Sequence, residues 1–454
     1  MLKRIISFLA LALALASPGA FAAQRAIAVI SIDGMHPNYV LKADDYGLRI
    51  PNLRRLLRDG VHATGVRGVL PTVTYPSHAT IVTGVWPAKH GIYANETWDP
   101  LRKNQGGWYW YSEDIQAPTL WQAAARAGYI VGSVSWPVTI GAPGVTYNIP
   151  EYWRAQTSDD LKLLRAVSTP GLLQQLQSTA GEYTLNLDAA EAGDRARTRY
   201  AIALIRQKGV RFLTLHLAAL DHVEHSNGPF SPRAFQALEE IDGMVGQVET
   251  AMREVDPRAA ICVVSDHGFG MADHRLNLDV AFIQAGLISL NPKASTPTIT
   301  DWKAMPWIHS GSAAIILRNP EDRAIRAKVE GLLRRLAADP NSGIDRILDR
   351  KAIANLGGAP AAAFWVDMKT NFLIGSALDG PVVEPIASHG VHGYAPTHPE
   401  LFASFLLAAP DARHGYNLGV IDMRSIAPTL ATLLGIPFPS ADLNGLPELQ
   451  NAAK

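Results

Sequence analysis

Acidic residues end three apolar segments of the chain, and two of these acids have a histidine at close spacing. The apolar segments are Ala26–Ile32, Phe212–Leu220 and Ala259–Ser265. The acids and their neighbouring histidines are Asp33, Asp221 with His225, and Asp266 with His267. Carboxylate oxygens and imidazole nitrogens are common ligands of divalent transition metals. These residues therefore predict a metal site, provided that the fold brings them together.

The apolar segments themselves indicate how that could happen. Runs of this length, rich in Ile, Val and Leu, are typical of strands buried on both faces of a parallel sheet. Such sheets bind ligands outside the carboxyl ends of their strands, so we expect the three acids to meet at one edge. A single Asp after a strand is more often a loop or helix-capping residue. The prediction of a metal site depends on the recurrence of an acid after three apolar segments. It also depends on the free-energy cost of burying several negative charges together without a cation.

A second segment whose residues could take part in catalysis is Pro71–Gly91, with the sequence PTVTYPSHATIVTGVWPAKHG. Pro76 predicts the start of a short helix that runs through Thr83, and Thr74 lies just before it. A hydroxyl at a helix start lies in a field that favours anions, which suits a phosphate and a developing alkoxide. Threonine is a poor nucleophile at neutral pH, but a metal bound to its oxygen would activate it. Without a metal, Thr74 would be an ordinary helix cap.

These motifs together resemble those of the nucleotide pyrophosphatase/phosphodiesterase family of the alkaline phosphatase superfamily. The resemblance follows nearly all of the chain in order. It is carried by ISIDGM at Asp33, the Thr74 segment, His90-Gly91, Asn95, Asp221-x-x-x-His225, SDHGF at Ser265–Phe269 and HGY at His392–Tyr394. It implies an α/β fold, with an alkaline-phosphatase-like core whose central sheet is mostly parallel and flanked by helices, plus an inserted cap region.

The resemblance also implies two zinc ions per chain. One would be bound by Asp221, His225 and His392. The other would be bound by Asp33, Thr74, Asp266 and His267. Thr74 would be the nucleophile, and Asn95 would donate a hydrogen bond to a phosphate oxygen. Nitrogen and carboxylate ligands suit zinc, although ligand chemistry alone leaves manganese open.

The predicted function is hydrolysis of phosphate diesters or pyrophosphate bonds through a phospho-threonine intermediate. Asn95 is neutral, which suits a diester better than a monoester with its extra negative charge. A phosphomonoesterase, a phosphonate hydrolase and a non-catalytic periplasmic protein that binds phosphate esters through its metals are the alternatives. Ser77 stands where the family usually has Asn, which predicts an altered leaving-group preference if that position contributes to the substrate pocket. The sequence specifies neither the leaving group nor the oligomeric state.

Of the 14 histidines in the chain, two compete with the assigned ligands. His222 directly follows Asp221, where the backbone is expected to point it away from the site. His389 lies three residues before His392, but only His392 has the HGY context. We therefore assign His392. Second-sphere or structural roles are expected for His78, His90, His216 and His274.

Strand and helix patterns alternate from Ala26 to about Val280, as in βαβ units. The pattern becomes irregular over residues 280–385, which we interpret as the inserted cap region of a catalytic domain spanning 23–454. Short strands are expected there at Ala313–Leu317 and Ala361–Val366. Helices are expected at Pro51–Asp59, Leu120–Ala127, Asp194–Gln207, Ser231–Val255 and Met423–Leu434.

The segment Trp98–Tyr111 contains three Trp and two Tyr residues. It predicts either an aromatic wall that stacks on a substrate group or a loop anchored by buried aromatic side chains. The second interpretation is slightly favoured.

Residues 1–22 have the pattern of a cleavable signal peptide. Lys3 and Arg4 precede the apolar stretch Ile5–Ala16, and Ala20-Phe21-Ala22 is a small-residue cleavage pattern. A periplasmic or secreted protein without a membrane span is therefore expected, and an uncleaved N-terminal anchor is the alternative. The 41 basic residues balance the 41 acidic ones, which excludes a strongly basic nucleic-acid-binding protein. A small-molecule phosphodiester or nucleotide is the expected partner. Cys262 is the only cysteine, so no internal disulfide can form.

Overall fold

A central eight-stranded sheet forms the core of the protein. The computed structural model describes residues 24–104, 106–154, 157–185 and 190–449. The strand order is β18-β2-β17-β7-β1-β6-β4-β5. In its centre, β1 (Ile27–Ile32) pairs in parallel with both β6 (Phe212–Leu217) and β7 (Ala260–Val264). All residues of these three strands are buried, which confirms the strands expected from the apolar segments.

The remaining strands extend this sheet on both sides. β4 (Val131–Val134) pairs in parallel with β6 and with β5 (Tyr147–Ile149). On the other side, β17 (Phe405–Ala408) runs antiparallel to β7 and to β2 (Val61–His62), and β18 (Tyr416–Asn417) closes the edge. The sheet is thus mostly parallel, as expected.

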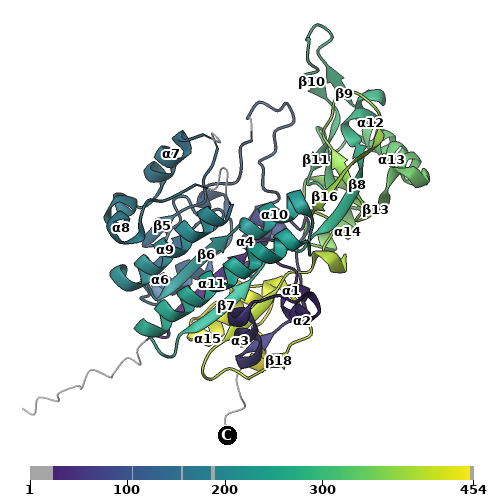
Figure 1. Ribbon diagram of the computed structural model, residues 1–454. Helices are drawn as coiled ribbons and strands as arrows, with labels where there is room; N and C mark the ends of the chain where they lie inside the picture. Colours follow the sequence, from purple (N-terminus) through teal and green to yellow (C-terminus); the bar gives the residue numbers. More distant parts are fainter. Residues whose placement is uncertain (1–23, 105, 155–156, 186–189, 450–454) are drawn as a thin grey trace, which may run out of the picture.

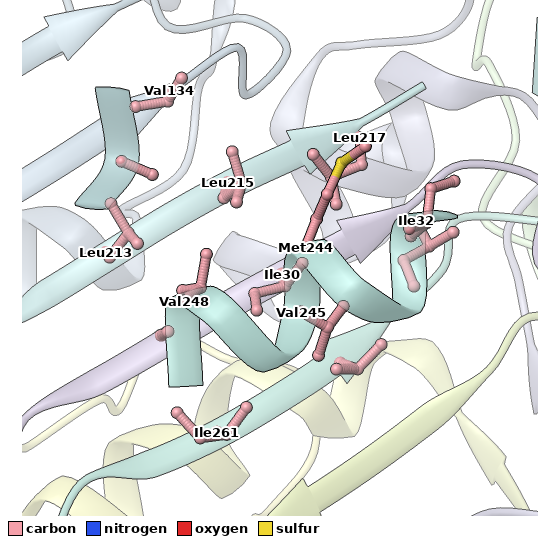
Figure 2. Packing of buried hydrophobic residues seen from close by; sticks show 14 of the residues in the cluster. Ile30, Ile32, Val134, Leu213, Leu215, Leu217, Met244, Val245, Val248 and Ile261 are labelled. Carbon is pink, nitrogen blue, oxygen red and sulfur yellow. The ribbon is translucent and has the colours of Figure 1, made fainter. Parts of the chain in front are cut away.

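Helices cover both faces of the sheet. One face carries α3 (Pro51–Asp59), α9 (Ala190–Lys208) and the long α11 (Pro232–Val255). Figure 2 shows Met244, Val245 and Val248 of α11 beside Ile30, Leu215 and Ile261 of the sheet. The opposite face packs against α4 (Thr74–Thr83), α6 (Leu120–Arg126) and α15 (Ile426–Leu434). Successive β1 residues alternate between the two apolar clusters, because side chains alternate along a strand.

The segment that leads to Asp221 differs from its expected form. The apolar run Phe212–Leu220 is not one strand, since β6 ends at Leu217 and α10 (Ala219–Asn227) begins two residues later. The carboxylate of Asp194 accepts hydrogen bonds from the backbone N–H groups of Ala218 (3.1 Å) and Ala219 (2.9 Å) and so caps this helix. Because Asp194 lies 24 residues before Ala218, local sequence patterns do not predict this cap. Asp221 therefore lies in the first turn of a helix rather than at a strand end.

The Thr74 helix also begins earlier than expected. α4 starts at Thr74, two residues before Pro76, which therefore lies within its first turn. Proline is tolerated there because the first backbone N–H groups of a helix have no intrahelical partner.

Residues between β7 and β17 form a second group of sheets with its own apolar cluster. Here β8 (Gly270–Asn277) pairs with β15 (Phe372–Gly375) and β16 (Val383–Val391). A four-stranded sheet comprises β11 (Ala304–Ile308), β12 (Ser312–Leu317), β14 (Ala362–Met368) and β13 (Ile344–Asp349). The helices α12 (Leu278–Gln284), α13 (Arg323–Ala338) and α14 (Arg350–Asn355) accompany these sheets. Figure 1 shows them as a green body to one side of the central sheet.

Both strands expected in residues 280–385 are present, as β12 and β14. β8 and β16 flank that range and pair with each other, so the sheet structure continues on either side of it.

Shorter helices complete the fold, namely α1 (Asn38–Leu41), α2 (Ala43–Tyr46), α5 (Pro87–His90), α7 (Asp159–Val167) and α8 (Leu172–Ala180). The expected signal peptide, residues 1–22, lies outside the described residues. Within the described part of the chain, no helix is both long and apolar enough to cross a bilayer.

Candidate metal centre

The ends of β1 and β7 and the start of α10 bring the three predicted acids together. Nε2 of His267 lies 3.5 Å from Oδ1 of Asp33 and 3.2 Å from Oδ2 of Asp266. Oδ1 of Asp221 lies 3.5 Å from Nε2 of His225. His392 directly follows β16, and its Nε2 lies 3.8 Å from the same Asp221 oxygen.

Among the described residues, all of these side chains except His225 form two overlapping groups whose potential ligand atoms lie within 4.8 Å of one another. One group contains Asp33, Asp266 and His267, and the other contains Asp221, His267 and His392. The rings of His267 and His392 stack at 3.8 Å, with 12° between their planes. His267 therefore lies between the two groups, whereas the sequence assigned it to the Thr74 group alone.

Several polar atoms in this cluster are buried and lack hydrogen-bond partners within the described structure. They are Asp33 Oδ1, Asp221 Oδ1, Asp266 Oδ2 and both ring nitrogens of His267. Buried polar atoms without partners are rare in native proteins, and a metal ion would use these oxygens and Nε2 as ligands. Their chemistry fits zinc and also fits manganese.

The pKa shifts within the cluster also indicate a site for a metal ion. Burial, followed by the charges of Asp266 and Asp221, raises the pKa of Asp33 well above its usual value. Burial raises the pKa of Asp221 to about 6, although His225 opposes the shift. Burial lowers the pKa of His267 to about 3, with His225 adding to the shift. These carboxylates repel one another, and burial favours the neutral form of His267, so the cluster is suited to a divalent cation.

Hydrogen bonds from behind the cluster fix the orientation of its side chains. Nε2 of His216 lies 3.0 Å from Oδ2 of Asp33, and its Nδ1 lies 3.1 Å from the carbonyl oxygen of Ser135. Nδ1 of His225 lies 3.1 Å from the carbonyl oxygen of Gly390. Nδ1 of His392 is held in the same way by Thr72, at 3.1 Å. These contacts leave Nε2 of both His225 and His392 directed toward Asp221.

Neither of the two competing histidines belongs to these groups of the described residues. His389 is part of β16, where its Nδ1 contacts the carbonyl oxygen of Ala387 at 2.8 Å, and it joins neither group of the described structure. His222 is exposed on α10 and lines a cavity beside the cluster. The geometry thus brings His392, rather than His389, to the carboxylates.

This cavity has a volume of about 630 Å³, and its lining includes Asp33, Thr74, Asp221 and His225. Thr74 is the first residue of α4, so the backbone N–H groups of the first turn lie beside its hydroxyl. Oδ1 of Asn95 accepts a hydrogen bond from the backbone N–H of Tyr75 at 2.9 Å. That bond uses the acceptor side of the Asn95 amide. Asn95 itself is not among the residues that line the cavity.

Ser77, which departs from the family pattern, is fully buried in α4 and does not line this cavity. The structure therefore gives it no direct contact with a substrate in the cavity.

The Trp98–Tyr111 segment has features of both interpretations. Trp98 packs against Trp302 and Trp307 of the second group of sheets, with ring centroids 5.7 and 5.5 Å apart. Trp108 instead lines the cavity and lies edge-on to Tyr75 at 5.1 Å. The same segment is thus anchored at one end and forms an aromatic wall at the other.

Sequence reasoning missed several residues of the cavity wall, above all Glu151, Trp153, Tyr183 and Arg197. A signal existed only for Arg197, which lies with Asp194 on the otherwise mostly uncharged buried face of α9.

A family model described as type I phosphodiesterase/nucleotide pyrophosphatase matches residues 27–395. Human ectonucleotide pyrophosphatase/phosphodiesterase family member 1 is 22% identical over 435 residues, which cover 92% of this chain and 41% of that protein. Mouse family member 3 is 27% identical over 254 residues, which cover 53% of this chain and 24% of that protein. The chain spans less than half the length of these curated relatives.

Solved structures share the fold. The structure of human ectonucleotide pyrophosphatase/phosphodiesterase 5 superposes with a TM-score of 0.65 at 19% identity, covering 94% of this chain and 100% of that chain. The murine counterpart, in an inactive form in complex with AMP, gives a TM-score of 0.64 at 20% identity, covering 94% of this chain and 98% of that chain. The fold is therefore alkaline-phosphatase-like, and the chain belongs to the type I phosphodiesterase/nucleotide pyrophosphatase family.

Proposed function

We propose that this protein is a metal-dependent phosphodiesterase, a nucleotide pyrophosphatase that cleaves phosphate diesters or pyrophosphate bonds through a phospho-threonine at Thr74. The observation that carries the proposal is a shared cavity. Thr74, at the N-terminus of α4, lines the same cavity as Asp33 and Asp221, each of which has a buried oxygen without a partner in the described structure. A nucleophile, an anion-favouring helix end and metal-type ligands thus surround one space.

Two zinc ions would be held by this cluster. Asp221, His225 and His392 would bind one ion, and Asp33, Thr74, Asp266 and His267 would bind the other. The same ligands would accept manganese. When bound, the ions would supply positive charge that favours the deprotonated Thr74 oxygen and offsets the charge gathering on phosphorus-bound oxygens.

The chain's own residues would carry the reaction in two displacements. Oγ1 of Thr74 gives up its proton to solvent and forms a bond to phosphorus, while the bond from phosphorus to the leaving oxygen breaks and that oxygen takes up a proton from solvent. Water then attacks phosphorus, the bond to Thr74 breaks, and the threonine hydroxyl is restored. The Asn95 amide donates to a non-bridging oxygen, and His216 holds Asp33 in place. Two in-line displacements predict overall retention of configuration at phosphorus.

Replacing the nucleophile tests the proposal. Thr74→Ala should lose at least roughly 10³-fold in kcat on bis(p-nitrophenyl) phosphate while folding normally, as expected when a nucleophile is removed. Thr74→Ser keeps a hydroxyl and should retain part of the activity. A brief reaction followed by intact-mass analysis should show a phosphorylated chain for wild type and none for Thr74→Ala. Near-wild-type turnover by a folded, metal-loaded Thr74→Ala protein would contradict the proposal.

One observation favours a phosphomonoesterase as the second candidate, namely the guanidinium of Arg197 in the cavity wall. An added cation of this kind would offset the extra charge of a monoester. Arg197 is already paired with Asp194 at 2.6 Å, however, so most of its charge is compensated. The ratio of kcat/KM for p-nitrophenyl phosphate and bis(p-nitrophenyl) phosphate separates the two candidates, and we expect the diester to be preferred.

The signal-peptide pattern of residues 1–22 supports a periplasmic or secreted location for this activity. The substrates there would be small phosphodiesters or nucleotides. N-terminal sequencing of the exported protein should find Ala23 as the first residue.

A further inference from the structure

His78 lies one helical turn after the proposed nucleophile, on the same helix, and takes no part in the two displacements. It is fully buried, as is every other residue of α4. Because α4 has no exposed polar face, the contrast between a buried and a solvated face does not set its orientation. Its N-cap residue, Val73, contributes no side-chain hydrogen bond to the first turn. Contacts from other side chains must therefore hold the start of α4, where Thr74 lies.

The imidazole of His78 makes one such contact at the nucleophile itself. Its Nδ1 lies 2.8 Å from the carbonyl oxygen of Thr74. A carbonyl oxygen only accepts, so this hydrogen bond places the ring hydrogen on Nδ1. Full burial favours the neutral ring, in which Nε2 then accepts from the hydroxyl of Ser31 at 2.9 Å. One ring thus joins the backbone of Thr74 to β1.

Ser31 makes this contact an anchor, because β1 is a central strand of the sheet. It pairs in parallel with both β6 and β7. Ser31 lies two residues before Asp33, so the two side chains lie on the same face of the chain. The backbone N–H of Asp33 donates to the carbonyl oxygen of Leu217 at 2.9 Å, which continues the pairing beyond the end of β1. The link from Thr74 through His78 therefore ends on the strand that leads into Asp33.

Two aromatic rings hold the His78 side chain between these partners. Trp136 and His216 lie edge-on to it, with ring centroids 4.9 and 4.6 Å away. His216 in turn contacts Oδ2 of Asp33 at 3.0 Å. Nδ1 of His78 lies 3.7 Å from Oδ2 of Asp266, beyond hydrogen-bond distance. His78 is thus packed directly behind two of the acids expected to bind metal.

We propose that His78 is a positioning residue for the nucleophile. Its ring ties the carbonyl group of Thr74 to Ser31 of β1 and so sets the distance between the Thr74 hydroxyl and the carboxylate of Asp33. The assignment rests on the proposed function, because it affects catalysis only if Thr74 attacks phosphorus. A purely structural contact would instead stabilise the fold and leave the turnover of each folded, metal-loaded chain unchanged.

His78→Phe keeps an aromatic ring between Trp136 and His216 and removes both nitrogen contacts. In the full-length, metal-loaded protein, kcat for bis(p-nitrophenyl) phosphate should fall by about 100-fold, the scale for a displacement of roughly 1 Å at a reacting group. KM should stay within about threefold of wild type, because substrate binding is not the step affected. His78→Asn should recover about tenfold of the loss, since its amide nitrogen can donate to the Thr74 carbonyl oxygen from the place of Nδ1. A kcat within about twofold of wild type in His78→Phe would overturn the assignment.

Thr83→Val is the matched control for a loosened helix. Thr83 is buried in the last turn of α4, and its hydroxyl donates to the carbonyl oxygen of Ala79, four residues earlier, at 2.7 Å. Valine has nearly the same shape and removes the same kind of bond at the far end of the helix. Thr83→Val should lower the midpoint of urea unfolding and leave kcat within about twofold of wild type. A loss of kcat equal to that of His78→Phe would overturn the assignment.

Ser31→Ala tests the other end of the link without a change in α4. It should lower kcat by itself, because the His78 ring loses its anchor on β1. Added to His78→Phe, it should cause no further loss beyond about twofold, since the two residues act through one connection. Independent effects that multiply in the double variant would overturn the assignment.

Zinc affinity separates this assignment from the proposed function. Competition with a chelating dye gives the Kd of each zinc ion in wild type and in His78→Phe. One Kd should rise by about tenfold, the lower end of the range for losing a contact behind a metal ligand, and the other should stay unchanged. This result supports the link even if the wild type hydrolyses no ester. Two unchanged Kd values overturn it even if a phospho-threonine is found.

Discussion

His392 is held through one ring nitrogen and presents the other to Asp221. Its Nδ1 contacts the carbonyl oxygen of Thr72, and its Nε2 lies 3.8 Å from Oδ1 of Asp221. His392→Ala should therefore retain about one zinc per chain and lose at least roughly two orders of magnitude in kcat, in the range for losing a charge that stabilises the transition state. Zinc content and turnover on bis(p-nitrophenyl) phosphate are measured on the same preparation.

His389 provides the control for this prediction, since it lies three residues earlier, in β16, but contacts Ala387 instead of the carboxylates. His389→Ala should keep both metals and most of the activity. If His389 proved indispensable and His392 dispensable, the ligand assignment would be wrong.

His309 gives the protein an acid-sensitive buried group. It stacks on Trp365 with ring centroids 5.3 Å apart, and its Nε2 is buried without a partner in the described structure. Burial lowers its pKa to about 3 from an ordinary value of 6.5. Between these pH values the unfolded chain binds a proton that the folded chain does not, so stability falls as pH falls below about 6.5.

His309→Phe removes this proton uptake and keeps a ring for the Trp365 contact. The free energy of unfolding should fall less steeply with decreasing pH in this variant, by roughly 1 kcal/mol per pH unit between pH 6.5 and 5. Urea unfolding at several pH values measures the difference. His414→Phe, at an exposed position, should leave the wild-type slope unchanged. Parallel slopes for wild type and His309→Phe would refute the prediction.

At the scale of elements, the turn after β16 positions His392. Gly393 has φ of +86°, and a Cβ there would lie 1.8 Å from the carbonyl oxygen of His309. Its N–H donates to the carbonyl oxygen of Thr72 at 2.9 Å, so the turn is tied to the segment that leads into α4. Only glycine fits this close approach.

Gly393→Ala should therefore displace the turn, lower zinc content by about one ion per chain and destabilise the protein by roughly 3 kcal/mol or more, because a clash adds to the left-handed strain. Gly380→Ala is the matched control, since Gly380 has φ of +90° with nothing within 4 Å of an added Cβ. It should cost only about 1–2 kcal/mol and leave zinc content unchanged. Equal effects of the two substitutions on zinc content would show that the turn does not position His392.

At the scale of the whole molecule, the cluster joins two bodies. Asp33, Asp221 and Asp266 come from elements at the edge of the central sheet, whereas His392 follows β16 of the second group of sheets. A metal bound by Asp221 and His392 would thus connect the two bodies seen side by side in Figure 1.

Removing metal should therefore abolish activity and lower the melting temperature by roughly 5–10 °C, because bound metal stabilises only the folded form and releases the repulsion among the acids. Calorimetry before and after EDTA treatment, followed by zinc addition, measures both effects and their reversal. Unchanged activity in a sample shown to be free of metal would rule out a catalytic metal site.

The sequence by itself determined which residues could do chemistry and the class of fold that holds them. Asp33 and Asp266 follow strands whose apolar character is local, and parallel neighbours place their carboxyl ends at one edge. The Thr74 segment and the family motifs are likewise contiguous in the chain. Information of this kind depends on neighbours within a few residues, so it can be read before any contact is known.

The tertiary structure decided what depends on contacts between distant segments. Asp221 lies on a helix because Asp194 caps it, and His392 faces the carboxylates because Thr72, 320 residues away in the sequence, holds its ring. The cavity wall formed by Glu151 and Arg197 has no sequence motif. Their burial arises only when α9 and the segment after β5 line one cavity, because desolvation is a property of the folded molecule rather than of the residue.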